Sequence, residues 1–372
     1  MKSAGSTPSV RSMDIDLGER SYTIYVGNGL VNSIGQLIKE RIPDVRICAV
    51  VTSEGIPNEH IEALNGSLES AGLKVGMVNV PVGEEAKSWD VAGSLIGELL
   101  DIGLDRRSAV IAFGGGAIGD LAGFAAAIYM RGVHLVQVPT TLLAQVDSSY
   151  GGKTAVNHPK GKNLIGAFYQ PSLVASDPGL LRTLPVRELL SGLGEVVKHG
   201  VIADPELFRL TEEERDRLLE ADSEALTEAV IRSVAIKGRL VEEDERDIKG
   251  SRAILNYGHT VGHALEILSD HELRHGEAVA IGMEAAAEIA VGLSLFKPED
   301  AERQTKTLDS LGCNLKLPEI NLETVMSVMH RDKKAVGDTI NFVLPTGIGS
   351  TPVVQGVPED TIVDTLERMG YG

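Results

Sequence analysis

The sequence predicts an α/β domain followed by a mainly helical domain, and three observations support this prediction. β-Branched runs alternate with helical periods between Tyr22 and about Asp177, as in an open α/β sheet. A strand, a glycine-rich turn and an Ala-rich helix follow one another over 109–129, the order found in nucleotide-binding α/β domains. After Leu184 the strand-like runs nearly vanish, and long amphipathic segments predict helices instead.

The predicted elements follow in order along the chain. The start, MKSAGSTPSVRS, lacks a long apolar run, so residues 1–20 are expected to form a flexible N-terminal tail. Helical spacing appears in two segments, 58–71 and 88–102, and a late isolated strand or hairpin is expected at 339–345. Pro178 and Pro185 bracket the hinge, which predicts domains at 21–184 and 185–372. Strands are predicted at 22–26, 47–52, 108–113, 133–138 and 173–176.

Composition excludes several classes of function. A net charge of -18 argues against binding of nucleic acid or of an anionic membrane surface. No run approaches the roughly 20 apolar residues that a membrane span requires. Two cysteines, Cys48 and Cys313, lie in apolar segments, so two buried thiols in a reducing cytoplasm are expected. Because the protein is acidic overall, a phosphate-bearing substrate would need a local basic pocket.

A glycine-rich turn predicts a nucleotide site. Gly114, Gly116 and Gly119 match G-x-G-x-x-G between a strand and a helix. Backbone without side chains can approach a pyrophosphate whose charge lies at the helix N-terminus. The acidic residue expected about 20 positions later is absent, so the standard dinucleotide pose is not predicted. A tight turn required only for close packing is the alternative.

A basic, glycine-punctuated stretch predicts an anion pocket. Residues 139–168 contain Lys153, Lys160 and Lys162 together with Asn157 and Asn163. Ammonium and amide groups among backbone N–H groups bind phosphate. A solvated loop is the alternative, but interleaved apolar residues favour the pocket.

Paired histidines predict a metal site. His259 and His263 stand four residues apart, and Glu266 continues the same helical face at i+7. Thr260 occupies the position of the glutamate in H-E-x-x-H, so a zinc protease is not indicated. Spacing alone leaves His259, His263 and Glu266 as a possible ligand set.

Six motifs combine these features, and through them the chain resembles the 3-dehydroquinate synthase family of sugar phosphate cyclases. The resemblance runs from about Gly18 to about Gly349. It implies an N-terminal Rossmann-like α/β NAD-binding domain and an all-α C-terminal metal-binding domain. The motifs are GGGAIGDLAGFAAAIYMRG, QVPTTLLAQVDSSYGGKTAVNHPKGKNLIGAFYQP, LGEVVKHG, LNYGHTVGHALE, HGEAVAIGM and RDKK.

The resemblance implies an activity in the shikimate pathway of aromatic amino-acid biosynthesis. The substrate would be 3-deoxy-D-arabino-heptulosonate 7-phosphate and the products 3-dehydroquinate and phosphate. The reaction would combine transient oxidation by NAD, phosphate elimination, re-reduction and intramolecular aldol closure. NAD, one divalent metal (Zn²⁺ or Co²⁺) and a homodimer are implied.

Site residues are carried over from the same motifs. The implied metal ligands are Glu195, His259 and His275, with His263 as an acid/base group beside the metal. Arg131 would reach a substrate phosphate across a dimer interface. The other substrate-binding positions are Asp147, Lys153, Asn163, Lys198, Lys237, Arg252, Asn256 and one lysine of RDKK, Lys333 or Lys334. The implied nucleotide contacts are Glu84, Lys87, Gly115, Gly116, Ala117, Ile118, Gly119, Asp120, Thr140, Thr141, Lys153, Lys162, Leu180, Leu181, Arg182 and Thr183.

Departures from the family pattern leave alternatives. Asp247 stands where the family usually has Glu, and the stretch to Arg252 is one residue longer. Val82 and Ser53 replace residues that often serve the cofactor. Another sugar phosphate cyclase, of the valiolone or 2-deoxy-scyllo-inosose synthase type, is one alternative. A metal-dependent polyol dehydrogenase that releases NADH is the second.

Overall fold

Two structural units are built from interleaved parts of the chain. The computed structural model describes residues 10–269, 272–313, 320–333 and 340–371, and side chains at 331–333 are outside this description. The first unit comprises Met1–Leu184 and Ala221–Arg246, and the second comprises Pro185–Glu220 and Asp247–Gly372. In the described part of the chain, no helix is both long enough and apolar enough to cross a membrane.

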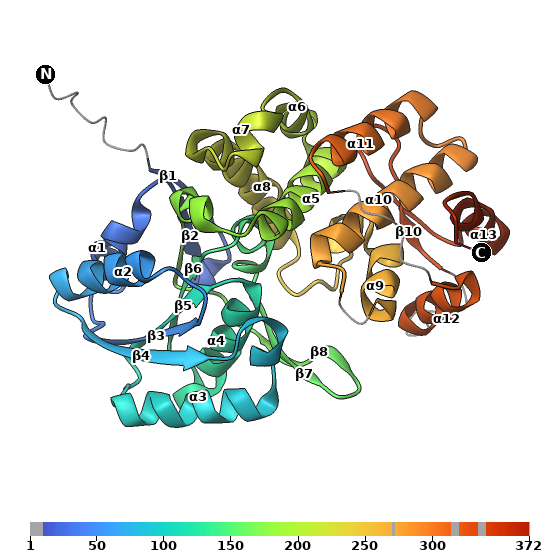
Figure 1. Cartoon of the computed structure of the whole chain (residues 1–372). Coiled ribbons are helices and arrows are strands. Elements are labelled where there is room, and N and C mark those ends of the chain that lie inside the picture. The colour runs from blue at the N-terminus through green and yellow to red at the C-terminus, as the bar shows by residue number, and fades with distance from the viewer. Residues whose placement is uncertain (1–9, 270–271, 314–319, 334–339, 372) are drawn as a thin grey trace, which may run out of the picture. The chain divides into compact units, whose positions relative to one another are not determined.

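A seven-stranded sheet forms the centre of the first unit (Figure 1). All its strand pairs are parallel except the β1–β2 pair. Gly114 pairs with Pro139, so β5 and β6 end at the same edge of the sheet. In spatial order the strands are β1 (Arg11–Ile15), β2 (Tyr22–Val26), β9 (Leu173–Ser176), β6 (His134–Pro139), β5 (Ala109–Gly114), β3 (Ile47–Ser53) and β4 (Lys74–Val80).

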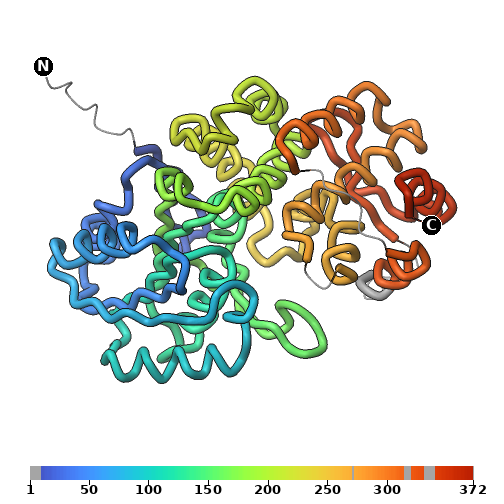
Figure 2. The backbone as a smooth tube through the Cα atoms, viewed as in Figure 1, coloured from blue at the N-terminus to red at the C-terminus, as the bar shows by residue number. Residues whose placement is uncertain are grey.

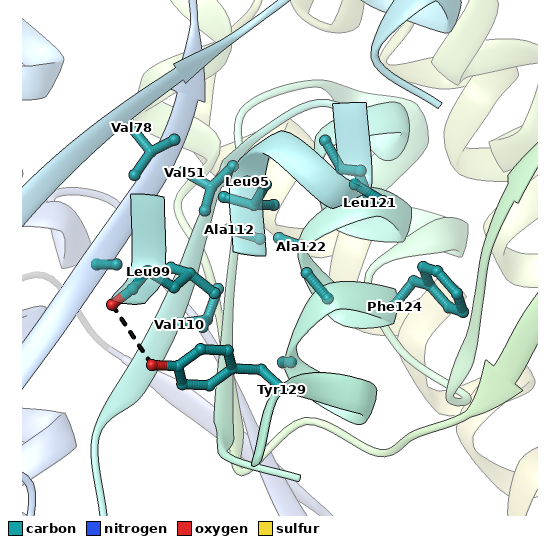
Figure 3. Close-up of a cluster of buried hydrophobic side chains, with 14 of the residues drawn as sticks. Val51, Val78, Leu95, Leu99, Val110, Ala112, Leu121, Ala122, Phe124 and Tyr129 are labelled. Atoms are coloured by element: carbon teal, nitrogen blue, oxygen red, sulfur yellow. Dashed lines mark hydrogen bonds between the residues drawn. The ribbon is translucent and has the colours of Figure 1, made fainter. Parts of the chain in front are cut away.

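Helices cover both faces of this sheet because its central strands are apolar on both sides. Helices α1 (Ile34–Arg41) and α2 (Asn58–Ser70) cover one face, and α3 (Trp89–Ile102) and α4 (Gly116–Ile128) cover the other. Figure 3 shows the second of these cores, in which the Tyr129 hydroxyl lies 3.5 Å from the Leu99 carbonyl oxygen. The same hydroxyl donates to the Leu104 carbonyl at 2.9 Å, so this buried polar group has a hydrogen-bond partner.

A two-stranded hairpin, β7 (Lys153–His158) and β8 (Gly161–Phe168), projects from the first unit (Figures 1 and 2). The Asn157 amide donates to the Lys87 carbonyl at 2.7 Å, which fastens the hairpin beside the segment before α3. The second half of the basic stretch that the sequence singled out thus forms a hairpin, on which Lys153, Lys160 and Lys162 are exposed.

The structure corrects two of the expected boundaries. Residues 11–15 form β1, which pairs antiparallel with β2, whereas residues 1–20 were expected to be a tail. Helix α8 (Ser223–Glu243) belongs to the first unit, although 185–372 was expected to be one domain. These two elements stabilise each other: a Cβ at Gly238 would lie 2.7 Å from Ile15, and the Asp16 amide donates to Glu242 at 2.7 Å.

The second unit is mainly helical. Close helix packing depends on glycine here: a Cβ at Gly194 would lie 2.8 Å from the Gly276 carbonyl oxygen, and one at Gly262 would lie 2.8 Å from that of Ala278. Helix α10 can therefore approach both α5 and α9 closely. The helices are α5 (Val186–Ala203), α6 (Pro205–Glu213), α7 (Arg215–Leu219), α9 (His259–Leu268), α10 (His275–Gly292), α11 (Pro298–Ser310), α12 (Leu322–Lys333) and α13 (Glu359–Arg368). A small sheet pairs β10 (Phe342–Val343) with β11 (Val353–Val354), as expected for part of 339–345.

Candidate active site

Three helices of the second unit bring together a carboxylate and two imidazoles. Glu195 lies on α5, His259 begins α9 and His275 begins α10. One ligand atom from each of these residues lies within 4.8 Å of the others. His275 Nε2 is 3.6 Å from Glu195 Oε1, and His259 Nε2 is 3.9 Å from the same oxygen. The residues that the resemblance implied as metal ligands thus converge on one point.

Hydrogen bonds at the far side of each ring fix which nitrogen faces Glu195. His259 Nδ1 lies 3.1 Å from the Tyr257 carbonyl oxygen, and His275 Nδ1 lies 3.1 Å from Glu266 Oε2. A carbonyl oxygen and a carboxylate oxygen only accept, so each Nδ1 must donate. In the neutral form of each ring, Nε2 therefore carries the lone pair, and both Nε2 atoms point toward Glu195.

This donor set fits a catalytic divalent metal. Metal bonds of about 2.0–2.1 Å at tetrahedral angles would separate two ligand atoms by about 3.3 Å. The Nε2–Oε1 distances of 3.6 and 3.9 Å need only small side-chain movements to reach that value. Two imidazoles and one carboxylate are a zinc-type set that leaves a coordination position for substrate or water.

Lys198 places a positive charge beside the same carboxylate. Its ammonium forms an ion pair with Glu195 one helical turn away, and both side chains are buried. Burial and the neighbouring Lys198 lower the pKa of His259 well below its ordinary value. Burial also opposes a charge on His275, but the carboxylates of Glu195 and Glu266 raise its pKa to about 9. The two imidazoles therefore lie in different electrostatic surroundings.

The other predicted residues of the second unit lie nearby in the chain. The His263 ring centroid is 5.0 Å from that of His259 and 6.0 Å from that of His275, which places it beside the candidate ligands. Arg252 is buried in a short 3₁₀ helix (Ser251–Asn256) that precedes α9, whereas Asn256 is exposed. The set that spacing alone allowed, His259, His263 and Glu266, is wrong because Glu266 engages His275 Nδ1 instead.

The glycine turn of the first unit has the expected strand–turn–helix form. Gly115 is the N-cap of α4, and this residue has no side chain with which to cap the helix. A Cβ at Gly116 would lie 2.8 Å from Ser148 Oγ, and one at Gly119 would lie 2.9 Å from Gln137 Oε1. Close packing thus accounts for both of these glycines, while the uncapped N–H groups still suit an anion.

A buried lysine connects three segments next to this turn. Lys87 Nζ donates to Asp120 Oδ2 at 2.7 Å and to Asn163 Oδ1 at 2.6 Å. Burial raises the pKa of Asp120, although Lys87 opposes the shift. Asn157 donates to Glu84 at 2.7 Å and accepts from the Asn163 amide at 2.9 Å. Three predicted nucleotide contacts and one predicted substrate contact therefore form one network.

A second lysine–carboxylate pair lies in the first unit. Lys237 Nζ on α8 donates to Asp147 Oδ1 at 2.5 Å and to the Asp147 carbonyl oxygen at 2.6 Å. Lys153 and Lys162 are exposed on the hairpin. The predicted substrate residues Asp147 and Lys237 are thus in direct contact.

The remaining predicted positions have varied surroundings. Thr140 donates its amide to the Gly114 carbonyl at 2.9 Å, and the Thr141 hydroxyl accepts from the Ala144 amide at 3.2 Å. In the 3₁₀ helix Pro178–Thr183, Leu180 and Leu181 are buried, so their side chains belong to the core. Arg182 and Arg131 are exposed.

Some predictions fall outside the description or were incomplete. Lys334 lies outside the described residues, as does the side chain of Lys333. Asp247 has a left-handed backbone with φ of 55°, an unusual conformation in the lengthened segment. Sequence analysis missed the partners of the histidines, Glu266 and Tyr257. The i+7 spacing of Glu266 was a signal, but it did not reveal that the side chain turns toward His275.

Comparison with known proteins shows which family the chain belongs to. Residues 77–191 match a family model described as 3-dehydroquinate synthase N-terminal, and 192–335 match 3-dehydroquinate synthase C-terminal. The 3-dehydroquinate synthase of Desulforamulus reducens (strain MI-1) is 44% identical over 96% of this chain and 99% of its own length.

Two solved structures share the fold. A 2-deoxy-scyllo-inosose synthase complexed with carbaglucose-6-phosphate, NAD⁺ and Co²⁺ is 27% identical, with a TM-score of 0.86 over 96% of this chain and 100% of the other. The 2-epi-5-epi-valiolone synthase of Streptomyces hygroscopicus subsp. jinggangensis 5008, with NAD⁺ and Zn²⁺ bound, is 26% identical, with a TM-score of 0.84 over 95% of this chain and 98% of the other. These likenesses, the full-length relative above all, show that the chain belongs to the 3-dehydroquinate synthase family.

Proposed function

We propose that this enzyme converts 3-deoxy-D-arabino-heptulosonate 7-phosphate to 3-dehydroquinate and phosphate. The single observation that carries the proposal is the convergence of Glu195, His259 and His275 beside the buried ammonium of Lys198. A substrate with neighbouring hydroxyls and a phosphate needs both a metal site and fixed positive charges. The likeness to full-length 3-dehydroquinate synthases favours this substrate over those of other cyclases.

Glu195, His259 and His275 would hold one divalent metal. When bound, the metal would polarise substrate hydroxyl oxygens and lower their pKa. Zn²⁺ is our first choice because two imidazoles and one carboxylate form a common catalytic zinc set, and Co²⁺ suits the same donors. The solved relatives with Zn²⁺ and with Co²⁺ support both choices.

NAD would bind the first unit at the turn between β5 and α4. The uncapped N-terminus of α4 would receive its pyrophosphate, and bound NAD would supply a reversible hydride acceptor. Glu84, Lys87 and Asp120 would contribute polar contacts from the Lys87 network. The segments 140–141 and 180–183, with Lys153 and Lys162, complete the proposed set.

This chain's own residues would orient the substrate and move its protons. Lys198 would donate to a substrate oxygen from a fixed position, because its ion pair with Glu195 on the same helix restrains the side chain. His263 would exchange a proton with the substrate beside the ligands. Arg252, Asn256, Asp147 and Lys237 would hold the other polar groups, with Lys153, Asn163 and Lys334 around the phosphate.

Assembly and location are further parts of this proposal. We infer a homodimer in which Arg131 reaches the substrate phosphate of the second copy. Support comes from the exposure of Arg131 and from two exposed apolar neighbours, Ile128 and Met130. A cytoplasmic location is proposed because Cys48 and Cys313 are buried free thiols.

A single assay separates this function from a dehydrogenase. Enzyme would be incubated with excess substrate and a small fraction of an equivalent of NAD, while phosphate and absorbance at 340 nm are followed. Return of the hydride in each turnover predicts many phosphates released per NAD and almost no lasting absorbance. Stoichiometric NADH with phosphate retained on the substrate would contradict the proposal.

A further inference from the structure

The two histidine ligands have different supports. His259 Nδ1 donates to a neutral backbone carbonyl, that of Tyr257, at 3.1 Å. His275 Nδ1 donates to a carboxylate, that of Glu266, also at 3.1 Å. An ionised acceptor forms a stronger hydrogen bond than a neutral one and increases the electron density of the imidazole more. The metal-facing nitrogen of His275 is thus the more basic donor by environment.

We propose that Glu266 is the positioning residue that orients His275 and tunes its affinity for the metal, an inference that rests on the proposed metal site. Glu266 lies two turns beyond His259 on α9, so one helix supplies a ligand and the support of a ligand from another helix. The Glu266 side chain is 15% exposed, which keeps its carboxylate close to the ring and only partly solvated.

The backbone of His275 is fixed independently, so Glu266 acts on the ring rather than on the helix. The Arg274 amide donates to Glu277 Oε2 at 2.7 Å, and the Gly276 amide donates to Ser191 Oγ at 3.0 Å. Glu277 is itself held by Arg187 Nε at 2.6 Å. These bonds hold the start of α10 on both sides of His275 and leave only ring rotation to be determined.

Ring rotation decides which nitrogen reaches the metal. Without an acceptor at Nδ1, the imidazole can change tautomer or turn its ring, and Nε2 loses its fixed direction toward Glu195. With Glu266 in place, the Nδ1 proton is held on the far side and the Nε2 lone pair faces inward. Removing such a partner typically lowers metal affinity by about 10–100-fold.

The test compares Glu266→Gln and Glu266→Ala with a matched control, Glu288→Gln. Gln keeps a neutral acceptor of nearly the same shape. Glu288 is a half-buried carboxylate on α10 that makes no side-chain hydrogen bond or ion pair with any of the described residues. Zn²⁺ affinity would be measured by chelator competition on each full-length protein. We expect wild-type affinity for Glu288→Gln, a smaller loss for Glu266→Gln and a 10–100-fold loss for Glu266→Ala.

Two further readouts distinguish ring positioning from simple loss of structure. ¹⁵N NMR of the imidazoles should show a changed His275 signal and an unchanged His259 signal in Glu266→Gln. Its unfolding midpoint without metal should equal that of the control. Zn²⁺ affinity of Glu266→Ala within twofold of the control would overturn the inference, as would an unchanged His275 signal. If the wild-type protein binds no Zn²⁺, the proposed metal site itself fails, which is a different result.

Discussion

Lys87–Asp120 in the first unit and Lys198–Glu195 in the second unit are both pairs with a buried lysine, and they differ in what they join. In the first unit Lys87 and Asp120 have side chains that are 7% and 19% exposed, and Lys87 also bonds Asn163. This pair joins α4, β8 and the segment before α3. In the second unit Lys198 and Glu195 are 1% and 0% exposed and lie three residues apart on one helix.

The two pairs differ in how much they can contribute to stability. When an ion pair joins separate elements, the stabilisation of their packing can offset part of the free energy lost by desolvating the two charges. The Lys198–Glu195 pair joins no separate elements, yet it is the more completely buried, and two histidines share its carboxylate. Such a pair is better explained by chemistry than by stability.

The largest expected effect follows from breaking the second pair. Glu195→Ala removes a proposed metal ligand and leaves the Lys198 ammonium buried without its carboxylate. Breaking a buried pair in this way costs about 3–5 kcal/mol of unfolding free energy. Elemental analysis should find no bound metal, and phosphate release should be lost.

A control on the same helix keeps this prediction specific. Glu188 forms a partly exposed ion pair with Arg274 at 3.0 Å, so Glu188→Ala should cost only about 0.2–1 kcal/mol and keep the metal. Full metal occupancy in Glu195→Ala would rule out the ligand assignment.

The next effect follows from breaking the first pair. Lys87→Met should weaken NAD binding, measured by calorimetry, and should lower the free energy of unfolding because Asp120 and Asn163 lose a shared donor. A hydrogen bond to a charged group contributes about 1.5–3 kcal/mol. Urea unfolding of Lys87→Met, Asp120→Asn and the double variant should give a coupling energy of that size. Additive single effects would mean that the pair does not link these segments energetically.

A third lysine, exposed at the start of the hairpin, should affect activity and not stability. Lys153→Ala removes a proposed phosphate contact, so kcat/KM for phosphate release should fall by roughly 10–150-fold, which corresponds to about 1.5–3 kcal/mol. Unfolding free energy should stay within about 0.5 kcal/mol of wild type. Lys297→Ala removes an exposed lysine that lies outside every proposed site, so it is the control and should leave both quantities unchanged. Equal kcat/KM values for the two variants would contradict the proposed contact.

The smallest expected effect concerns the rates at which a thiol reagent labels the one cysteine buried in each unit. Burial raises the pKa of both Cys48, on β3, and Cys313, just after α11, to about 12. Neither thiolate forms appreciably at pH 8, so Ellman's reagent should label native protein very slowly and both cysteines once urea unfolds it. Cys48→Ser and Cys313→Ser would assign each rate to one unit. Rapid labelling of one thiol in native protein would show that its unit opens locally.

Sequence patterns predicted the central sheet well, because its strands carry strong apolar signals. The runs at 22–26, 47–52, 108–113, 133–138 and 173–176 all fall on strands, within a residue or so at each end. The two edge strands, β1 and β4, were missed. RSMDI of β1 is half polar and becomes a strand only by pairing with β2, and β4 pairs with β3 alone. The assignment of α8 was missed for a similar reason: its contacts with β1 are long-range and leave no local pattern.

The site was predicted unevenly. Helical periodicity alone grouped His259 with His263 and Glu266 as possible metal ligands. A helical face does not reveal which residues of other helices complete a site, and the structure groups His259 with Glu195 and His275. The motif resemblance gave Glu195 and His275, and the structure brings them together with His259. Neither route gave Glu266 as the partner of His275 or Asn157 as the link between the hairpin and Glu84. Such contacts depend on side-chain direction, which sequence spacing leaves open.

The late return of α8 to the first unit has a consequence for biosynthesis. Residues Ala221–Arg246 belong with Met1–Leu184, and Pro185–Glu220 of the other unit are made in between. At about 5–20 residues per second, the ribosome makes this stretch from 184 to 246 in roughly 3–12 s. During that time the apolar side chain of Ile15, which will face Gly238, has no helix to cover it. The nascent first unit is therefore incomplete on emergence, and this interval is when a chaperone would have most to protect.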